Sequence, residues 1–305
     1  MKVLLIGFGS IGRRHYEVLS GFSEVSEIHI VTKQALTDRT TFTCLEDVSN
    51  LDQYDYFLIA SETSKHFEQL TWLNKNVLHK KIFCEKPLFE SEQAFKKGCN
   101  DIFVGYVLRF HPLLQKLKAL IKGQKILSLN VSCGSYLPNW RANIDYKDSY
   151  SAKKSQGGGV LLDLSHELDY TNWITGGLTE IKSFQTKVSN LEIDSDDFVS
   201  MIATTKEGGG IILSIDYFSH LSHRRLLLNT NEFTIELDLI QNKMTQTFLS
   251  GEVESFETPS LERNYLFEQM HREILFNNKP PFACDLTSGL EVMAIIQTIQ
   301  DENHE

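Results

Sequence analysis

The stretch GGGVLLDLSHELDY, residues 157–170, places an aspartate and a histidine three positions apart in a leucine-rich segment. A helix is predicted over residues 159–175, and positions i and i+3 are neighbours on a helix, so the side chains of Asp163 and His166 can touch. Histidine titrates near neutral pH, and a carboxylate beside it can orient the ring and raise its basicity, as acid–base catalysis requires. An ordinary structural contact within the helix is the alternative.

A lysine follows a short apolar run in the first third of the chain. The sequence Phe83-Cys84-Glu85-Lys86-Pro87 ends the run Ile82–Cys84, which we interpret as a strand of a parallel sheet. Ligands of such sheets bind at the carboxyl ends of the strands. A positive charge close to a partly buried lysine lowers its pKa, so Lys86 could bind a ligand oxygen or share its proton.

The sequence Gly7-Phe-Gly-Ser-Ile-Gly12 directly follows the apolar run Val3–Ile6 and opens a helix. In a dinucleotide-binding turn of this form, the first glycine permits the bend, the second lets the backbone approach a pyrophosphate, and the third lets helix and strand pack closely. The amides at the helix start, with Ser10 and Ile11, then face the pyrophosphate. A glycine-rich turn without a ligand is the alternative.

The choice between NAD and NADP depends on the tip of the second strand, Val31-Thr32-Lys33. An acidic residue that would hold the ribose 2′-hydroxyl of NAD is missing there. Thr32 and Lys33, with help from Arg13, suit a 2′-phosphate, so NADP is favoured over NAD. Alternatively, Lys33 is only a solvated strand end.

The elements that carry these residues indicate two domains. Short apolar runs separated by amphipathic segments predict a doubly wound parallel sheet of the Rossmann type for residues 1–112. Its predicted strands are Val3–Ile6, Ile28–Val31, Tyr56–Ala60, Ile82–Cys84 and Ile102–Tyr106. Residues 113–305 predict an α+β domain with an open, mostly antiparallel sheet, because Phe233, Ile235 and Leu237 alternate with polar residues and Gly208–Gly210 suits a hairpin turn.

Composition favours a small-molecule ligand. The chain has 305 residues, 41% of them hydrophobic, and a formal net charge of -10, which disfavours nucleic acid or an anionic membrane as partner. Its five cysteines are far apart and form no CxxC, so neither a disulfide framework nor a thiolate metal site is predicted. His220 and His223 have a spacing that some metal sites use, but no metal is expected. We expect a cytoplasmic protein.

The segments GFGSIGRRH, CEKPL (84–88), GYVLRFHP (105–112) and GGGVLLDLSHELDY resemble, in this order, the glucose-fructose oxidoreductase, inositol dehydrogenase and MocA (Gfo/Idh/MocA) family of dehydrogenases. The resemblance implies a Rossmann domain joined to a domain with an open sheet, and a catalytic set of Lys86, Asp163 and His166. The family spaces its aspartate and histidine by four residues rather than three. If Glu167 occupies the position of the histidine, the assignment of the base fails.

Further site residues are predicted around this set. The cofactor is expected to contact the glycine turn and strand tips, namely Gly7, Gly9, Ser10, Ile11, Gly12, Thr32, Lys33, Ala60, Ser61, His66, Glu85 and Lys86. For Ala60, Ser61 and His66, helix capping is the alternative, and Arg109 could instead tie the domains together. The substrate is expected to contact Tyr106, Arg109, Tyr136, Trp140, Arg141, Tyr150 and Tyr170, four of which belong to an irregular stretch at residues 136–155.

The resemblance implies hydride transfer between a nicotinamide cofactor and a secondary hydroxyl or keto group of a sugar or sugar derivative. Residues 134–159, with GSYLPNWR followed by DYKDSYSAKKSQGGG, resemble family members of surface-polysaccharide or acidic-sugar biosynthesis, and this resemblance implies an acidic or nucleotide-linked sugar. Two rival functions remain: a dinucleotide-binding sensor without catalysis, and a lyase or glycosidase that uses NAD as a redox shuttle. Because an open sheet commonly hides one face against another subunit, a homodimer or larger homo-oligomer is expected.

Overall fold

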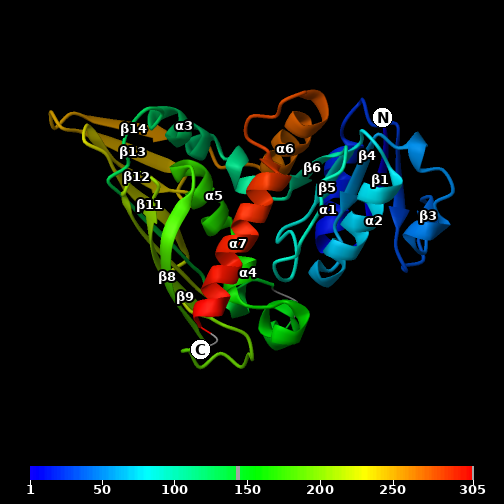
Figure 1. Ribbon diagram of the computed structural model, residues 1–305, viewed down its shortest axis with the longest axis horizontal. Helices are drawn as coiled ribbons and strands as arrows, with labels where there is room; N and C mark the ends of the chain where they lie inside the picture. Colours follow the sequence, from blue (N-terminus) through cyan, green and yellow to red (C-terminus); the bar gives the residue numbers. More distant parts are fainter. Residues whose placement is uncertain (142–144, 304–305) are drawn as a thin grey trace. The chain divides into compact units, whose positions relative to one another are not determined.

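The computed structural model describes residues 1–141 and 145–303 (Figure 1). The chain divides into two compact units. The first unit comprises Met1–Phe110 and Glu262–Leu290, and the second comprises His111–Leu261 and Glu291–Glu305. Among the described residues, no helix has the length and apolar character needed to cross a membrane.

The first unit contains a sheet with the strand order β15-β6-β5-β4-β1-β2-β3. Its strands are β1 (Lys2–Ile6), β2 (Glu27–Val31), β3 (Thr41–Phe42), β4 (Tyr56–Ile59), β5 (Lys81–Cys84), β6 (Asp101–Val104) and β15 (Cys284–Asp285). All neighbouring strands are parallel except β15, which is antiparallel to β6. The five predicted strands and the doubly wound Rossmann fold are confirmed.

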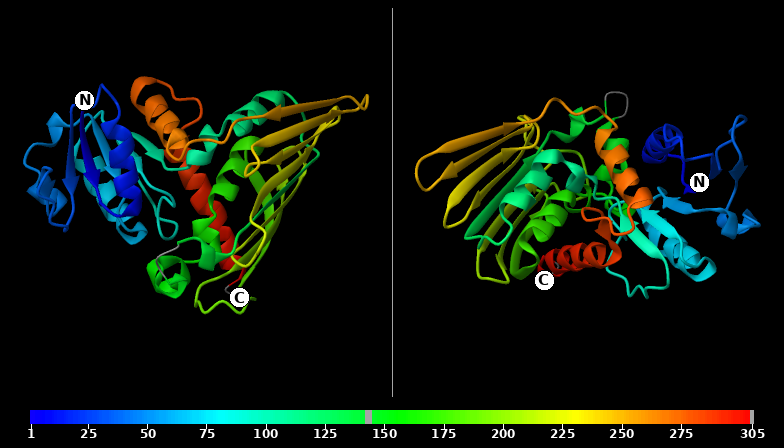
Figure 2. Two further views of the ribbon diagram at one scale, coloured as in Figure 1. Left: turned by 180° about the vertical axis from the view of Figure 1, so that it is seen from behind. Right: turned by 90° about the horizontal axis from the view of Figure 1, so that it is seen from above.

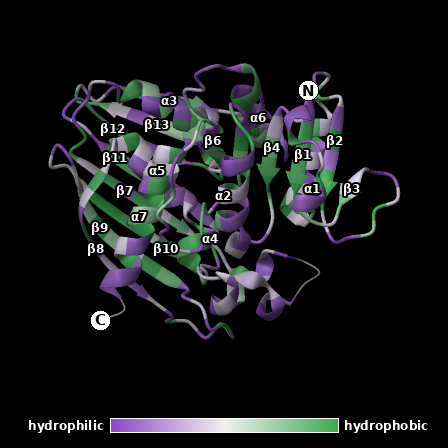
Figure 3. Cartoon of the chain, turned by 45° about the vertical axis from the view of Figure 1, so that its right-hand side comes forward, coloured by the Kyte–Doolittle hydropathy of each residue, from purple (hydrophilic) through white to green (hydrophobic). Residues whose placement is uncertain are grey.

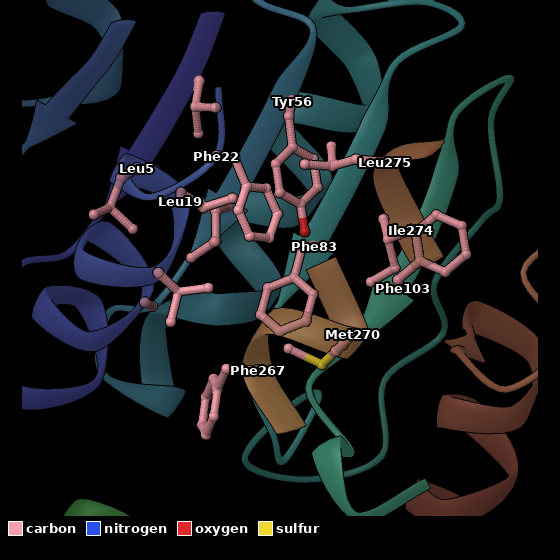
Figure 4. Close-up of a cluster of buried hydrophobic side chains, with 14 of the residues drawn as sticks. Leu5, Leu19, Phe22, Tyr56, Phe83, Phe103, Phe267, Met270, Ile274 and Leu275 are labelled. Atoms are coloured by element: carbon pink, nitrogen blue, oxygen red, sulfur yellow. The ribbon is translucent and has the colours of Figure 1, made fainter. Parts of the chain in front are cut away.

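Helices α1 (Ser10–Ser20), α2 (His66–Asn76) and α6 (Tyr265–Phe276) belong to this unit. Phe267, Met270 and Ile274 of α6 are buried at helical spacing beside side chains of β4, β5 and α1, as Figure 4 shows. The segment 262–290 therefore belongs to the first unit, whereas the predicted boundary assigned everything after residue 112 to the second domain. The apolar face of α6 explains this return, because it completes the core of the first sheet.

The second unit contains a sheet with the order β14-β13-β12-β11-β7-β10-β9-β8. Its strands are β7 (Ser128–Gly134), β8 (Leu178–Thr186), β9 (Phe198–Thr205), β10 (Gly210–Asp216), β11 (His223–Asn229), β12 (Phe233–Asp238), β13 (Lys243–Phe248) and β14 (Val253–Glu257). Among the described strands of this sheet, β7 and β10 are the only parallel neighbours, so the predicted mostly antiparallel sheet is confirmed. Helices α3 (Pro112–Leu120), α4 (Val160–Asp163) and α5 (His166–Thr175) lie along one face of it, with the later part of α7 (Leu286–Glu302) (Figure 2).

The two sheets differ in how their strands are buried. All four residues of β4 are buried, as expected for a parallel strand covered on both faces, and Figure 3 shows β1 and β4 in the green of hydrophobic residues. In β12, Phe233, Ile235 and Leu237 are buried and their neighbours are not, which confirms the predicted alternation. The predicted hairpin turn lies between β9 and β10, where Gly208 has a φ of +81°.

Candidate functional site

The glycine turn after β1 is shaped for close approach of the backbone. Gly7 has a φ of +93°, and a Cβ atom there would lie 2.6 Å from the carbonyl oxygen of Ala60. A Cβ at Gly12 would lie 2.3 Å from the carbonyl oxygen of Gly7, whereas a Cβ at Gly9 would meet no described heavy atom within 4 Å. Gly7 and Gly12 thus serve the packing of the turn, and Gly9 leaves open space before α1.

The start of α1 suits a dinucleotide. Within the described part of the chain, no side chain caps this helix end, and its first turn carries no acidic residue. The first amides of the helix, which include those of Ser10 and Ile11, can therefore bind the pyrophosphate of a dinucleotide, with the helix dipole adding positive potential.

The residues after β2 lie at a positively charged strand tip. Lys33 is exposed, and the hydroxyl oxygen of Thr32 accepts a hydrogen bond from the backbone amide of Gln34 at 3.2 Å. The Arg13 guanidinium donates to the side-chain oxygen of Gln34. Thr32 and Arg13 therefore share one contact residue, which brings the first turn of α1 to the end of β2.

Two guanidinium groups lie over the ring of Phe8 in this turn. The Cζ atoms of Arg13 and Arg39 are 4.6 and 5.6 Å from the ring centroid. Arg39 is also paired with Asp38 at 3.0 Å. With Lys33, the strand tip thus carries three cations and one nearby acid, which suits a phosphate better than a neutral ribose hydroxyl.

His66, at the start of α2, connects the ends of β4 and β5. Its ring is 1% exposed, with Nδ1 at 3.0 Å from the carbonyl oxygen of Pro87 and Nε2 at 3.3 Å from that of Ser61. Burial lowers the pKa of His66, so the ring is neutral and donates to one of the two carbonyls. The Ser61 hydroxyl in turn donates to Gln69 at 2.6 Å. His66 therefore holds the two strand ends together rather than reaching outward.

The end of β5 carries the predicted lysine. Lys86 is partly exposed, while the carboxylate of Glu85 lies 2.8 Å from His15 Nε2 and accepts the backbone amide of Lys86 at 3.0 Å. The residues after β6, Tyr106 and Arg109, are only 1% and 2% exposed. The first unit thus gathers a glycine turn, two polar strand tips and a lysine at one edge of its sheet, as parallel pairing of the strands demands.

The predicted helix over residues 159–175 is wrong in one respect, because it is broken. Helix α4 ends at Asp163, and α5 begins at His166, with Leu164 and Ser165 between them. The amide of Glu167 reaches Leu164 at 3.2 Å across three residues, which marks the irregular turn. Helical i, i+3 geometry therefore does not set the separation of Asp163 and His166. Each of these residues lies at a helix end.

The glycine run before α4 fits around an acidic cap. Gly159 has a φ of +128°, and a Cβ there would lie 2.2 Å from Oδ1 of Asp196. Oδ2 of Asp196 accepts the amide of Leu161 at 3.0 Å, which satisfies one free donor at the start of α4. Burial raises the pKa of Asp196, while this amide contact opposes the rise.

Two phenol groups converge on the carboxylate of Asp163. The Tyr217 hydroxyl, just after β10, donates to Oδ2 at 2.6 Å, and the Tyr150 hydroxyl is hydrogen-bonded to the same carboxylate. Burial and then the negative charge of Asp163 raise the pKa of both tyrosines, so both stay protonated and act as donors. Asp163 is 7% exposed, so its charge depends on such donors. Sequence analysis missed Tyr217, because nothing in its local sequence links it to Asp163.

Residues at the start of α5 face in different directions. His166 is partly exposed, whereas every other residue of the stretch 158–172 is buried. Glu167 is completely buried and lies 2.7 Å from the Arg224 guanidinium of β11. Burial raises the pKa of Glu167, and the charge of Arg224 opposes that shift. Glu167 is thus committed to an ion pair at the sheet, which leaves His166 as the accessible titratable group.

Tyr170 and the aromatic stretch have different surroundings. Tyr170 is 0% exposed and lies beside the Glu167–Arg224 pair. It is therefore a core residue, and not the substrate contact that was predicted. In the irregular stretch, the Trp140 indole donates to Ser135 at 2.9 Å and packs edge-on against Tyr217 at 5.2 Å.

The exposed part of the irregular stretch combines cations and aromatic rings. The Arg141 guanidinium lies 5.1 Å from the ring centroid of Tyr150, which is 43% exposed, and the Tyr136 ring packs against His220 in a tilted arrangement with centroids 4.5 Å apart. Such surfaces suit a sugar ring with an anionic substituent. Within the described residues, no three histidine, cysteine, aspartate or glutamate side chains gather as a metal site would require.

Comparison with known proteins matches both halves of the chain to one family. Residues 1–99 match the oxidoreductase family with an NAD-binding Rossmann fold, and residues 114–236 match the GFO/IDH/MocA C-terminal domain. The chain belongs to the GFO/IDH/MocA family. This GFO/IDH/MocA protein is therefore an oxidoreductase with an NAD-binding Rossmann domain, as the resemblance predicted. Curated protein sequences contain no match close enough to count as a relative.

Solved structures share the fold at low sequence identity. A levoglucosan dehydrogenase in complex with NADH has a TM-score of 0.85 and 16% identity, and the match covers 100% of this chain and 97% of that chain. A UDP-N-acetylglucosamine 3-dehydrogenase, GnnA from Acidithiobacillus ferrooxidans, has a TM-score of 0.76 and 18% identity over 99% and 97% of the two chains. GenD2 from gentamicin A biosynthesis, in complex with NAD, has a TM-score of 0.78 and 15% identity over 100% and 94%.

Proposed function

We propose that this GFO/IDH/MocA protein transfers a hydride between a nicotinamide cofactor and a secondary hydroxyl or keto group of a sugar or sugar derivative. The observation that carries the proposal is the buried Asp163 carboxylate, held by the phenols of Tyr150 and Tyr217 at the helix end just before the accessible His166. A protein that only senses a dinucleotide has no need of a fixed carboxylate and a histidine in this arrangement. The solved relatives named as dehydrogenases of levoglucosan and of UDP-N-acetylglucosamine support a sugar as substrate.

In the proposed reaction, the bound nicotinamide accepts or donates the hydride. His166 acts as the acid or base that exchanges the proton of the substrate hydroxyl, and Asp163 is its proposed carboxylate partner. Lys86 binds the substrate oxygen through its ammonium group and stabilises negative charge that develops there. Replacing Lys86 by Ala or His166 by Asn should remove most turnover and leave the affinity for the cofactor nearly unchanged.

We also propose a preference for NADP over NAD, which the cations Lys33, Arg13 and Arg39 at the end of β2 support. Equilibrium binding of NADH and NADPH, followed by energy transfer from tryptophan at one fixed salt concentration, tests this proposal. Tighter binding of NADPH that weakens in Lys33→Asp supports it. A tenfold tighter affinity for NADH would overturn the preference. If neither nucleotide binds at millimolar concentration, the dinucleotide site itself is refuted.

The proposed substrate class is an acidic or nucleotide-linked sugar. Arg141 supplies a cation at the exposed ring of Tyr150, which can stack on a sugar or base, and Lys153 and Lys154 follow in the same stretch of sequence. A panel of neutral sugars, inositols, uronic acids and nucleotide-linked sugars, assayed by absorbance of the reduced nicotinamide, tests the class. Much faster turnover of neutral sugars and inositols would contradict it.

The proposed quaternary state is a homodimer formed through the open face of the second sheet. On this face Phe184, Ile202 and Ile212 are 53%, 57% and 55% exposed, and Ile202 is the register partner of Ile212. A hollow of about 550 Å³ beside them is lined by residues of both charges, among them Arg225 and Glu236. An apolar patch beside mixed charges suits a second copy related by a twofold axis.

The five free cysteines support the proposed location in a reducing cytoplasm.

A further inference from the structure

The first unit contains a buried chain of four hydrogen-bonded polar side chains that ends directly after β5. The Tyr56 hydroxyl of β4 lies 3.1 Å from Nδ1 of His271 in α6. His271 Nε2 lies 2.8 Å from Nδ1 of His15 in α1, and His15 Nε2 lies 2.8 Å from Oε1 of Glu85. Tyr56, His271 and His15 are 0% exposed, and Glu85 is 7% exposed. Strand β4, helices α6 and α1 and the turn after β5 thus meet in one continuous set of hydrogen bonds.

Aromatic side chains surround the middle of this chain. The rings of Phe83 and Phe267 pack edge-on against His15, with centroids at 5.2 and 5.3 Å. The Arg14 guanidinium lies over Phe267 at 4.3 Å and is near enough to Glu85 for their charges to interact. The chain therefore lies in an apolar shell where unsatisfied polar atoms are costly.

The direction of the hydrogen bonds follows from chemistry. Burial lowers the pKa of His271 well below its usual value, so this ring is neutral. Burial and then the charge of Glu85 raise the pKa of Tyr56 well above its usual value, so the phenol keeps its proton. If Tyr56 donates to His271, then His271 donates from Nε2 to His15, and His15 donates from Nε2 to Glu85. This arrangement satisfies every nitrogen and leaves charge only on the carboxylate.

The opposite direction of donation along this chain leaves a polar hydrogen without an acceptor and requires an additional charge. His271 would donate from Nδ1 to Tyr56, and His15 would need a proton on both nitrogens to reach His271 and Glu85. The phenol proton would then lack an acceptor among the hydrogen bonds of the described residues. The first arrangement is therefore the one that the geometry favours.

The last member of the chain touches the backbone of the reactive lysine. Oε2 of Glu85 accepts the amide of Lys86 at 3.0 Å. A Cβ atom at Gly105, just after β6, would lie 2.9 Å from Oε1, so only glycine leaves room for the carboxylate. Glu85 is thus held by the histidine on one side and by the Lys86 amide on the other. Its position fixes the first peptide of the turn that carries Lys86.

We propose that Tyr56, His271 and His15 form a one-directional hydrogen-bond relay that fixes the carboxylate of Glu85 and, through the backbone amide of Lys86, positions the reactive lysine. The role given to Lys86 rests on the proposed function. The three residues are positioning residues, because none of them is argued to touch substrate. The relay joins the helix that carries the dinucleotide turn to the turn that carries the lysine.

The ring tautomers provide a test that needs no substrate. In protein labelled with ¹⁵N-histidine, long-range proton–nitrogen spectra at pH 7.5 should show His15 and His271 as neutral rings with the proton on Nε2. The variants His15→Gln and His271→Gln assign the two rings, since each removes one set of signals. A proton on Nδ1 of His271, or a doubly protonated His15, would overturn the relay whether or not a substrate is known.

Turnover tests the positioning role. His15→Leu should lower kcat by about 10- to 100-fold, the scale of a small misplacement of a reactive group, while the dissociation constant for the nicotinamide cofactor stays within about twofold. His15→Gln, which can accept from His271 and donate to Glu85, should recover part of the loss. The matched control is His29→Leu, because His29 Nδ1 lies 2.8 Å from the Tyr54 hydroxyl in the same unit but has no link to Glu85 among the described hydrogen bonds. It should leave kcat within about twofold.

The outcomes separate the two proposals. If the wild-type protein turns over no sugar, the proposed function fails, and the tautomers alone decide on the relay. If the wild-type protein is active and His15→Leu keeps its kcat, the positioning role is refuted and the proposed function stands. If His15→Leu does not fold, Tyr56→Phe, which removes only the first donor, takes its place. Tyr56→Phe should then lower kcat without weakening cofactor binding, and an unchanged kcat would refute the role.

Discussion

At the scale of single residues, the charge of Asp163 depends on two phenol donors. Replacing Tyr217 by Phe removes the 2.6 Å hydrogen bond to Oδ2 and leaves the ring in place. A hydrogen bond to a charged group contributes roughly 1.5–3 kcal/mol, so kcat/KM should fall by about 10- to 100-fold if the carboxylate serves catalysis. Steady-state kinetics with the best substrate of the panel measures this.

The control for that prediction is Tyr54→Phe. Tyr54 is also fully buried, but it belongs to the first unit, and its hydroxyl contacts the His29 ring instead of a carboxylate. This variant should keep kcat/KM within about twofold. Equal losses in the two variants would mean that any buried tyrosine matters and that Tyr217 has no special relation to Asp163.

At the scale of elements, helix α3 depends on a neutral histidine. His111 is the N-cap, and its Nδ1 accepts the amide of Leu113 at 3.2 Å. Burial lowers the pKa of His111, so the folded ring stays neutral while the unfolded ring gains a proton as the pH falls below about 6.5. The stabilisation is therefore complete above pH 6.5 and is lost as the pH falls below it.

The pH dependence can be assigned to this cap with His111→Asn, which keeps a side-chain acceptor but cannot titrate. The free energy of unfolding in urea should fall between pH 7.5 and 5.5 in the wild-type protein and fall less, by roughly 1 kcal/mol, in the variant. His29, His66 and His271, whose pKa values burial also lowers, contribute to the rest of the decrease. An identical decrease in both proteins would contradict the role of His111.

Neighbouring arginines of β11 face opposite sides of the sheet and should behave differently. Arg224 pairs with the fully buried Glu167, whereas Arg225 pairs with Asp238 at 2.7 Å on the open face with 51% of its side chain exposed. Arg224→Ala leaves a buried carboxylate unpaired and should lower the free energy of unfolding by about 3–5 kcal/mol. Arg225→Ala should lower it by less than about 1 kcal/mol. Equal effects in urea unfolding would show that Glu167 finds another partner.

The elements also show what sequence patterns can and cannot predict. Apolar runs predict β1, β4 and β12 because period and burial are local properties of a strand. The break between α4 and α5 has no such signal, since Leu164 and Ser165 are compatible with a continuous helix. Tyr217 follows β10, and the turn after β10 faces α4, which ends at Asp163. The hydrogen bond therefore joins residues that are 54 positions apart in the sequence. A local motif thus predicts the glycine turn after β1, whereas the donors around Asp163 depend on tertiary contacts that no local motif encodes.

At the scale of the molecule, the course of the chain differs from a simple succession of two domains. Segment 262–290 returns to the first unit and supplies α6 and the edge strand β15. Strand β15 is only two residues long, and the amphipathic pattern of α6 is compatible with packing in either domain. The sequence pattern alone therefore does not show to which domain these two elements belong. The proposed relay shows a consequence of this return, because His271 of α6 contacts His15 of α1.

The open face of the second sheet should hold the proposed dimer together. Ile202 and Ile212 are register partners on neighbouring strands and more than half exposed. Two lysines there would place like charges against their symmetry mates in an isologous interface, so Ile202→Lys with Ile212→Lys should convert the proposed dimer to a monomer in light scattering. Leu78→Lys, at an apolar residue 63% exposed in the first unit, is the control and should stay dimeric. A wild-type monomer, or a double variant that remains dimeric, would refute this face as the interface.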